Sequence, residues 1–504
     1  MVCTKNFLMR RKRVVNVQLY TNDKSNLIVW YVKGDRMKKK LISGLLCVAM
    51  VLSLTACGGS GSGTGGTGDT PSEAAAPEEA AEETESAGAA SGEETESAAS
   101  GGDGSGLELA YNLATEDFAV FEGLIKDFTA ETGIDVTIYN GGDDYESAMK
   151  TRMSSGDLPD MWVTHGWSII RYSEYMMDLS DQPWVANIDA GLKDVITNDN
   201  GELFILPITQ AVAAIMYNKD VLEAAGVDPT TIRTWDDFNA ACQAIADKTE
   251  ATPIELCLGD AFDAYMLEVI WPTLYSNNDI ADNKAAALQD GSFDFTVDGA
   301  DSFQMVSDWF TSGFFNEDYV SGKKDDICSA LANGEGGFAL YSTEMIPSIL
   351  AYNEEANIGI LPVPAKDDST ASYFGTGEGN FSCFGIWKDT EYADQCKQLL
   401  EYLARPEIAV QVVKIDGGIP GLTDTVLDEN DLAAYTTNAF KEAQAQFDGD
   451  LVYDNFFDRE YLPSGMWSVM GDSLGTLLAD GDPETSKEEA MGMVQDNYSD
   501  LMGN

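Results

Sequence analysis

The stretch "LELAYNLATEDFAVFEGLIKDFTAETGIDVTIYN" (residues 107–140) decides the fold. Four apolar residues recur at helical spacing in its middle part: Phe121, Leu124, Ile125 and Phe128. Gly133 follows them and is typical of a helix end. Before this helix, Leu107–Thr115 is typical of a strand that runs into a loop. After it, residues 134–138 alternate between apolar and polar, as in a half-buried strand. The stretch therefore predicts a strand, a helix and a second strand.

The same alternation of elements continues to residue 166. A second helical stripe, formed by Tyr145, Ala148, Met149 and Met153, ends at Gly156, and "PDMWVTHG" (residues 159–166) is typical of a third strand. This order predicts an α/β fold with a parallel sheet covered by helices. Ligands of such sheets gather beyond the carboxyl ends of the strands. We therefore expect ligand contacts from residues 111–117 and 164–167, with a further contribution from residues 141–144.

Strands and helices also alternate in the rest of the chain. Strands are expected at Ala211–Tyr217, Gly336–Ser342, Ile358–Ala365 and residues 380–387. Helices are expected after Asn218, after Thr234 (where Asp237 completes a pattern that resembles a capping box), within residues 393–407 and from Met466 onward. We find no internal repeat, phosphate-binding loop, EF-hand or dinucleotide fingerprint in the sequence.

The N-terminal part has the layout of an export signal. Three lysines (Lys38–Lys40) precede an apolar run, residues 41–56, that is shorter than the ~20 residues needed to span a bilayer. The run ends in "LTAC" (residues 54–57), which resembles the bacterial lipobox and makes Cys57 the expected lipidated mature N-terminus. The alternative is a plain signal peptide with a chance cysteine.

Two segments flank this signal, which we place at residues 37–57. Residues 1–36 are basic and lack the layout of a signal, so we expect a mis-called extension, with a genuine cytoplasmic extension as the alternative. Residues 58–106 are rich in Gly, Ser, Ala, Thr and Glu and contain no aromatic residue, which predicts a flexible tether. The folded domain is then expected at residues 107–504.

Charge and cysteine content exclude several classes of function. The net charge of −55 disfavours nucleic acid as a partner and also disfavours attraction to an anionic membrane surface, so only the lipid is expected to hold the domain there. His165 is the only histidine, which argues against a multi-histidine zinc site. The five cysteines after Cys57 are expected to be buried thiols, although one disulfide between two of them stays open. They are Cys242, Cys257, Cys328, Cys383 and Cys396.

Five segments, in this order, resemble the extracellular solute-binding proteins (family 1) of bacterial ABC importers, the family that includes maltose-binding protein. They are "FTAETGIDVTI", "MSSGDLPDMWV", "LPITQAVAAIMYNKDVLEAAGVDPTTIRTWDDF", "ANGEGGFALYSTEMIPSI", and "IGILPVPA" followed by "LLEYLARPEIAVQ". Each segment is weak evidence alone, but together they cover nearly all of residues 107–504.

The resemblance implies a two-lobe periplasmic-binding-protein fold of type II, with mostly parallel sheets, helices on both faces and a hinge. By analogy, lobe one comprises about 107–211 and 362–425, and lobe two about 212–361 and 426–504. It further implies that the ligand is held in the cleft, that the lobes close on it, and that it is delivered to a permease driven by a cytoplasmic ATPase. A monomer without cofactor or metal is expected.

A sugar site needs flat rings for the apolar faces of a pyranose and planar polar groups for its hydroxyl edges. The candidates are residues after predicted strands or at matched family positions: Tyr111, Asn112, Thr115, Glu116, Thr164, His165, Trp167, Gln210, Trp271, Glu344, Glu378 and Trp467. By resemblance, Trp271 and Trp467 match aromatics near the sugar of maltose-binding protein. Trp167 replaces a polar contact and Glu344 replaces a tryptophan, which implies a different sugar.

Structural roles compete with these assignments. Any single tryptophan is more often part of the core, and four are expected there: Trp162, Trp235, Trp309 and Trp387. Glu116 and Asp117 could be a solvated face, His165 is more typical of a loop hydrogen bonder than of a ligand or base, and the acidic pairs at 143–144 and 325–326 are more typical of solvated surface than of metal sites.

The leading hypothesis is a lipid-anchored receptor that captures a carbohydrate and has no catalytic activity. A surface glycoside hydrolase is the alternative from another class, and it would need two carboxyl groups at a set separation. A third alternative keeps the fold but changes the ligand to a peptide, polyamine or anion. An anion is disfavoured because the candidate loops are poor in Arg and Lys. The sequence leaves the sugar and the permease open.

Overall fold

The computed structural model describes residues 4–8, 14–20, 29–32, 106–113, 115–141, 145–164, 172–198, 200–260, 263–276, 283–368, 372–378, 382–447, 451–478 and 480–503. The chain divides into two units, residues 1–80 and 81–504, which we treat separately. The predicted signal, lipobox and tether lie outside the described residues, as do His165 and Trp167. Among the residues that are described, no helix is long and apolar enough to cross a membrane.

The first unit contains a small antiparallel sheet in the order β1-β2-β3. Thr4 pairs with Gln18, and Val17 pairs with Val32. The strands are β1 (Thr4–Leu8), β2 (Val14–Tyr20) and β3 (Val29–Val32). The expectation that residues 1–36 are a mis-called extension stays a prediction.

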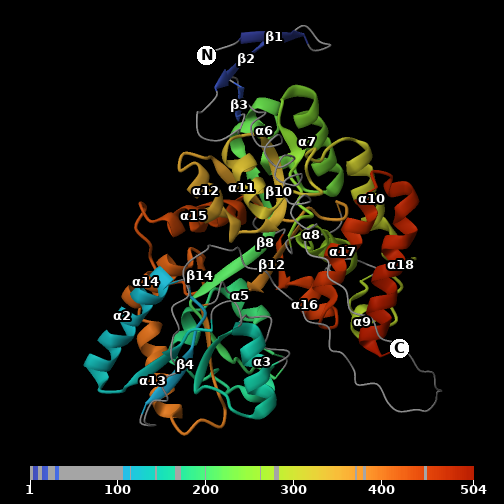
Figure 1. The fold of residues 1–504 in the computed structure, drawn as a ribbon. Coiled ribbons are helices and arrows are strands. Elements are labelled where there is room, and N and C mark those ends of the chain that lie inside the picture. The colour runs from blue at the N-terminus through green and yellow to red at the C-terminus, as the bar shows by residue number, and fades with distance from the viewer. Residues whose placement is uncertain are drawn as a thin grey trace, which may run out of the picture. The chain divides into compact units, whose positions relative to one another are not determined.

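The second unit contains two sheets, and the first of them confirms the predicted strand–helix–strand–helix–strand order (Figure 1). Its order is β5-β4-β6-β13-β7, in which β4 runs parallel to β5 and β6, while β13 is antiparallel to β6 and β7. The strands are β4 (Leu107–Ala110), β5 (Val136–Tyr139), β6 (Met161–Thr164), β7 (Ile205–Pro207) and β13 (Cys383–Ile386).

The helices of this part pack their apolar stripes on the first sheet. Phe121, Ile125 and Phe128 of α2 are buried, as are Met149 and Met153 of α3. The helices are α2 (Thr115–Thr132), α3 (Tyr145–Ser155), α5 (Ala190–Val195), α13 (Ala393–Leu403) and α14 (Pro406–Asp416).

Two of these helices differ from the sequence prediction. Helix α2 begins at Thr115 and not near Phe121, so the acidic residues that follow Thr115 occupy its first turn, where the helix dipole favours them. The expected single helix within residues 393–407 is instead interrupted at Arg405, whose extended backbone precedes Pro406, the first residue of α14.

The second sheet is built around β8, whose ten residues are all buried. Its main order is β15-β12-β8-β10-β9, and β11 and β14 also pair with β8. The run "TQAVAAIMYN" suits a strand that is covered on both faces. The strands are β8 (Thr209–Asn218), β9 (Thr252–Ile254), β10 (Gly336–Ser342), β11 (Ile358–Leu361), β12 (Ser372–Glu378), β14 (Ile419–Pro420) and β15 (Leu451–Asn455).

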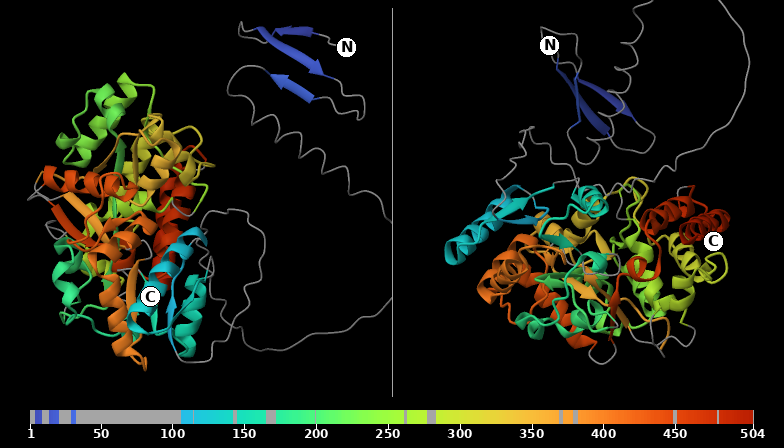
Figure 2. Two further views of the ribbon diagram at one scale, coloured as in Figure 1. Left: turned by 90° about the vertical axis from the view of Figure 1, so that its left-hand side faces the viewer. Right: turned by 90° about the horizontal axis from the view of Figure 1, so that it is seen from below.

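Hydrogen bonds confirm two of the predicted helix starts in the part of the chain associated with the second sheet. Asn218 caps α6, and Thr234 and Asp237 form the capping box of α7. The C-terminal helices α17 and α18 lie side by side, in red in Figures 1 and 2. The helices are α6 (Lys219–Ala225), α7 (Trp235–Lys248), α8 (Tyr265–Trp271), α9 (Ala285–Asp290), α10 (Ala300–Thr311), α11 (Lys324–Ala332), α12 (Met345–Tyr352), α15 (Leu432–Gln446), α16 (Phe457–Tyr461), α17 (Met466–Leu478) and α18 (Pro483–Met502).

The buried apolar residues of the second unit form two hydrophobic clusters. The boundary between the clusters falls between Ile208 and Val212, at the start of β8. One cluster draws on residues 107–208 and 383–433, and the other mainly on residues 212–374 and 439–498. The division is consistent with the expected lobe boundaries, which stay a prediction. One segment differs, because β12 pairs with β8 and β15 in the second sheet although the prediction assigns residues 372–378 to lobe one.

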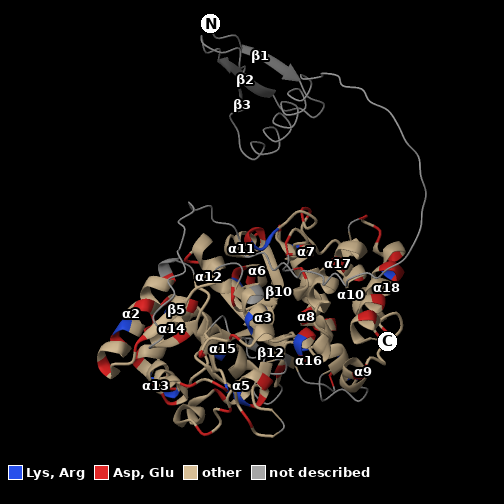
Figure 3. Ribbon diagram, turned by 60° about the horizontal axis from the view of Figure 1, so that its bottom comes forward, with Lys and Arg blue, Asp and Glu red and all other residues tan. Residues whose placement is uncertain are grey.

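The predictions for cysteine and for four tryptophans are confirmed. All five cysteines of the second unit are free and buried. Trp162, Trp235 and Trp309 are buried, and Trp387 packs against the first cluster. The ribbon coloured by residue type shows acidic residues on most of the labelled helices, whereas basic residues are few (Figure 3).

Candidate ligand-binding site

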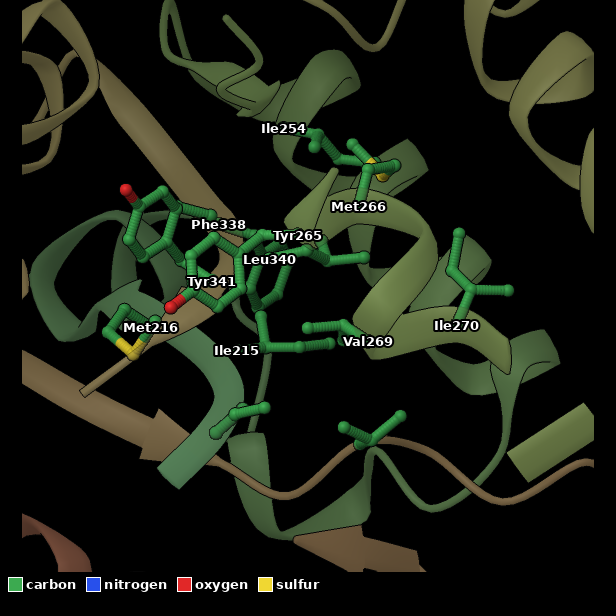
Figure 4. Packing of buried hydrophobic residues seen from close by; sticks show 14 of the residues in the cluster. Ile215, Met216, Ile254, Tyr265, Met266, Val269, Ile270, Phe338, Leu340 and Tyr341 are labelled. Carbon is green, nitrogen blue, oxygen red and sulfur yellow. The ribbon is translucent and has the colours of Figure 1, made fainter. Parts of the chain in front are cut away.

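Three aromatic side chains form a continuous row beside the second sheet. The rings of Tyr265 and Tyr341 stack with their centroids 4.1 Å apart and their planes 26° apart (Figure 4). Trp467 meets Tyr265 edge-on, with centroids 4.9 Å apart and an interplanar angle of 88°. Tyr265 and Tyr341 are buried, whereas Trp467 is only half-buried. The row, hereafter the aromatic row, therefore reaches the surface at Trp467.

A cation lies at each end of the aromatic row. Lys324 places its Nζ atom 5.9 Å from the Tyr341 ring centroid and 3.9 Å from an oxygen of Glu344. At the other end, the guanidinium carbon of Arg459 lies 5.3 Å from the Trp467 ring centroid, and its Nη1 atom lies 3.1 Å from Asp458. The row thus combines ring surface with charged hydrogen-bonding groups, as recognition of a polar ligand with apolar faces requires.

A second group of residues surrounds the carboxyl group of Asp416, the last residue of α14. Thr209 and Ser382 donate hydrogen bonds to it, and the Ser382 hydroxyl lies 2.7 Å from that of Tyr111. Either hydroxyl group can be the donor in the bond between Tyr111 and Ser382. This network joins the end of β4, the start of β8 and the start of β13.

The electrostatics of Asp416 connect the two groups. Burial raises its pKa to about 7, although the hydrogen bonds from Thr209 and Ser382 lower it. The negative charges of Glu344 and Asp117 raise it further. Glu344, which pairs with Lys324 at one end of the aromatic row, therefore also acts electrostatically on Asp416.

The packing disfavours two predicted aromatic contacts, Tyr111 and Trp271, although both stay predictions. The Tyr111 ring is fully buried, with Phe121 and Phe384 at centroid distances of 4.7 and 5.4 Å. Trp271 is also fully buried and donates its indole N–H to Ser302 over 3.0 Å. Neither ring has a face available to a ligand, because every residue of α8 is enclosed and Tyr111 fills the core beneath the sheet end.

Three other candidates are less directly connected to the aromatic row, whereas a fourth, Glu344, pairs with Lys324 at its end. Asn112 is half-buried in the loop after β4, and Thr164 is buried at the end of β6. Gln210 is buried and its amide lies 3.5 Å from the Pro420 carbonyl. Glu344 is half-buried at the start of α12.

The remaining candidates are placed only in part. Glu378 ends β12, opposite Ala211 of β8. Thr115 and Glu116 belong to the first turn of α2 and not to a loop. His165 and Trp167 lie outside the described residues, so these assignments stay predictions.

The sequence prediction did not include several residues that the structure brings to this region: Tyr265, Lys324, Ser382, Asp416, Asp458 and Arg459. Asp416 contacts Thr209 across 207 positions of the sequence, so no local pattern could have revealed the pair. Tyr265 is the first residue of α8, and only its aromatic character could have indicated a role. Within the described part of the chain, no group of three or more His, Cys, Asp or Glu is arranged to hold a metal ion.

Comparisons with known proteins show the family of the chain. A family model described as "bacterial extracellular solute-binding protein" matches residues 112–410. The melibiose/raffinose/stachyose-binding protein MelE of Bacillus subtilis is 29% identical over 365 residues, which cover 71% of this chain and 82% of MelE.

Two solved structures extend the similarity to three dimensions. A binding protein of Bacillus subtilis in an open conformation is 27% identical, with a TM-score of 0.70, and the match covers 80% of this chain and 99% of that protein. A sugar transporter protein of Bacillus licheniformis in complex with stachyose is 25% identical, with a TM-score of 0.63, over 78% of this chain and 99% of that protein. Both support the two-lobe solute-binding fold.

Proposed function

Because the chain belongs to the bacterial extracellular solute-binding protein family, we propose that it is the substrate-binding receptor of an ABC importer and that its ligand is an oligosaccharide. The relatives support this choice of ligand, since MelE is named for melibiose, raffinose and stachyose and the Bacillus licheniformis protein was solved with stachyose. A galactose-containing oligosaccharide of this type is the leading candidate. The receptor role requires no catalysis.

The observation that carries the proposal is the aromatic row with its half-buried end at Trp467. A pyranose presents a faintly apolar face that an indole can cover, and Trp467 retains surface for that contact. Glu344, Lys324 and Arg459 supply charged groups for hydroxyl edges nearby. The contact set we retain is Asn112, Thr115, Glu116, Thr164, His165, Trp167, Gln210, Glu344, Glu378 and Trp467.

Ligand capture is proposed to occur between lobe one and lobe two, with closure about β8. A ligand can favour the closed form only if it makes contacts there that the open form lacks. Glu344, which pairs with Lys324 and acts electrostatically on Asp416, provides a polar group for such contacts. The loaded receptor would then deliver the sugar to its permease and ATPase as a monomer.

We propose that a lipid on Cys57 anchors the protein to the extracellular face of the cytoplasmic membrane. The support is the "LTAC" sequence after the basic and apolar segments, followed by the Gly/Ser-rich tether. Replacement of Cys57 by Ala is expected to move the protein from the membrane fraction of expressing cells to the soluble fraction or the medium. Retention in the membrane by Cys57→Ala would contradict the anchor.

One observation favours a second class of ligand. The carboxyl groups of Asp117 and Glu344 both act electrostatically on that of Asp416, and several negative charges in one region would suit a polyamine. Calorimetric titration of residues 107–504 with stachyose, raffinose, melibiose, maltose and spermidine distinguishes the ligands. Saturable binding of a galactose-containing sugar without release of monosaccharide is expected. Release of monosaccharide would indicate a hydrolase, and binding of spermidine alone would replace the sugar by a polyamine.

A further inference from the structure

The carboxyl group of Glu268 is deeply buried in α8 and holds the beginning of another helix. Glu268 is 1% exposed, and its two oxygens accept hydrogen bonds from the backbone N–H groups of Phe457 and Asp458, the first two residues of α16. A buried carboxyl group is unfavourable unless its oxygens are bonded in this way. The backbone of α16 is thereby fixed to α8.

The short helix α16 carries the pair that contacts Trp467. Asp458 is 2% exposed, and its carboxylate lies 3.1 Å from Nη1 of Arg459. The Arg459 guanidinium in turn lies over the Trp467 ring. The contacts therefore run from Glu268 to Asp458, then to Arg459, and end at the half-buried indole at the surface end of the aromatic row.

The charges in this chain of contacts constrain one another. The Arg459 guanidinium pairs with Asp458, and its positive charge also acts on the buried Glu268 carboxyl group. Burial and the Asp458 carboxylate raise the pKa of Glu268, while the two N–H groups and Arg459 lower it. A shift of α16 would move the guanidinium away from the indole, because both carboxyl partners are attached to that helix or bonded to it.

We propose that Glu268 is a positioning residue for ligand binding, which fixes the orientation of Trp467 through Asp458 and Arg459. This inference rests on the proposed function, because it assigns a role within the same sugar site. Glu268 itself has no exposed surface with which to touch the ligand.

A second buried carboxyl group in the same hydrophobic region offers a matched control. Glu255 is 6% exposed, and burial raises its pKa to about 8. The charges that raise its pKa further are those of Asp318 and Glu335, and neither Asp458 nor Arg459 is among the causes. A general effect of removing a buried carboxylate should therefore appear equally in Glu255→Gln and Glu268→Gln.

The test is a double-mutant cycle read out as the dissociation constant for the best sugar of the panel. Glu268→Gln is expected to raise the dissociation constant about tenfold in the wild-type background and less than twofold in a Trp467→Phe background, since coupled residues are non-additive. Glu255→Gln should leave the dissociation constant unchanged in both. An equal change in both backgrounds, or equal behaviour of Glu268→Gln and Glu255→Gln, would overturn the proposal.

Two further measurements test the proposal if Glu268→Gln does not fold or if the wild type binds no sugar. If Glu268→Gln does not fold, Arg459→Lys tests the same link, because an ammonium cannot reproduce the planar stack, and at least a threefold weaker affinity is expected.

If the wild type binds no sugar, the proposed function fails, and acrylamide quenching of ligand-free protein still tests the positioning. Subtraction of the Trp467→Phe signal isolates Trp467, whose quenching should rise in Glu268→Gln or Arg459→Lys and not in Glu255→Gln. Unchanged quenching, or unchanged affinity in Arg459→Lys, would overturn the proposal.

Discussion

The hydroxyl groups of Tyr111 and Ser382 lie 2.7 Å apart although 271 positions separate them in the sequence. Their bond continues to Asp416 and from there to Thr209, so one carboxyl group joins four segments at the start of β8. Because burial raises the pKa of this group to about 7, its protonation is linked to folding stability near neutral pH.

Stability should fall as the pH rises from about 5.5 to 7.5. The folded pKa of Asp416 is raised above its usual value of 3.8, so the folded state holds a proton in this range that the unfolded state has lost. Each pKa unit corresponds to ~1.4 kcal/mol, so Asp416 alone contributes a decline of roughly 2 kcal/mol between pH 5.5 and 8.5. Asp263 and Glu255, with pKa values raised to about 7 and 8, act in the same direction.

Urea denaturation of the wild type and of Asp416→Asn at pH 5.5, 7 and 8.5 tests this link. The variant should show a smaller decline, whatever its absolute stability. Asp428→Asn is the control, since the pKa of this exposed carboxyl group is lowered by Asn430 and its contribution is lost only in acid. A pH dependence that is identical in Asp416→Asn and wild type would contradict the linkage.

Trp467 and Trp271 should respond to mutation in opposite ways. Trp467→Ala removes half-buried ring surface and is expected to weaken sugar binding about tenfold or more, with a small loss of stability. Trp271→Ala leaves a cavity in a filled core and is expected to lower the free energy of unfolding by about 3–5 kcal/mol. Calorimetric titration and thermal unfolding of both variants measure the two effects. Normal binding by Trp467→Ala would remove it from the site.

The five buried thiols should be unreactive in the folded protein. Burial raises the pKa of each, so little thiolate forms at neutral pH, and access is closed as well. Mass spectrometry after treatment of residues 107–504 with N-ethylmaleimide should find no adduct on the native protein and five adducts after denaturation. The same result without prior reduction would show that no pair is oxidised. Fewer than five adducts under those conditions would reveal a disulfide.

The local elements could be predicted from the sequence because their signals are local. The stripe of Phe121, Ile125 and Phe128 and the capping pair Thr234 and Asp237 each lie within one or two helical turns. Strand β12 escaped prediction because glycines at 375 and 377 weaken its strand signal, and its pairing with β15 depends on residues about 80 positions away.

The candidate site was predicted less well, and for a physical reason. A strand end or a matched family position indicates where a residue lies in the fold. Whether its ring is buried or exposed depends on the packing of the whole core. Tyr111 and Trp271 were assigned to the ligand from such positions, and both are enclosed. Conversely, Arg459 contacts Trp467 and Asp416 contacts Thr209, and no local pattern in the sequence predicts either contact.

Glu344 should affect both the ligand and the proton on Asp416. Glu344→Gln replaces a charged hydrogen-bonding partner by a neutral one and breaks the ion pair with Lys324, so sugar binding is expected to weaken about three- to tenfold. The same change removes a negative charge that raises the pKa of Asp416, so the decline of stability with pH should begin to level off at a lower pH. Titration with the best sugar and urea denaturation from pH 5.5 to 8.5 measure the two effects on one variant.

Asp325→Asn, on the exposed side of α11, is the control for lost charge. If Glu344→Gln weakens binding but leaves the pH dependence unchanged, the electrostatic connection between the aromatic row and the Asp416 network is wrong.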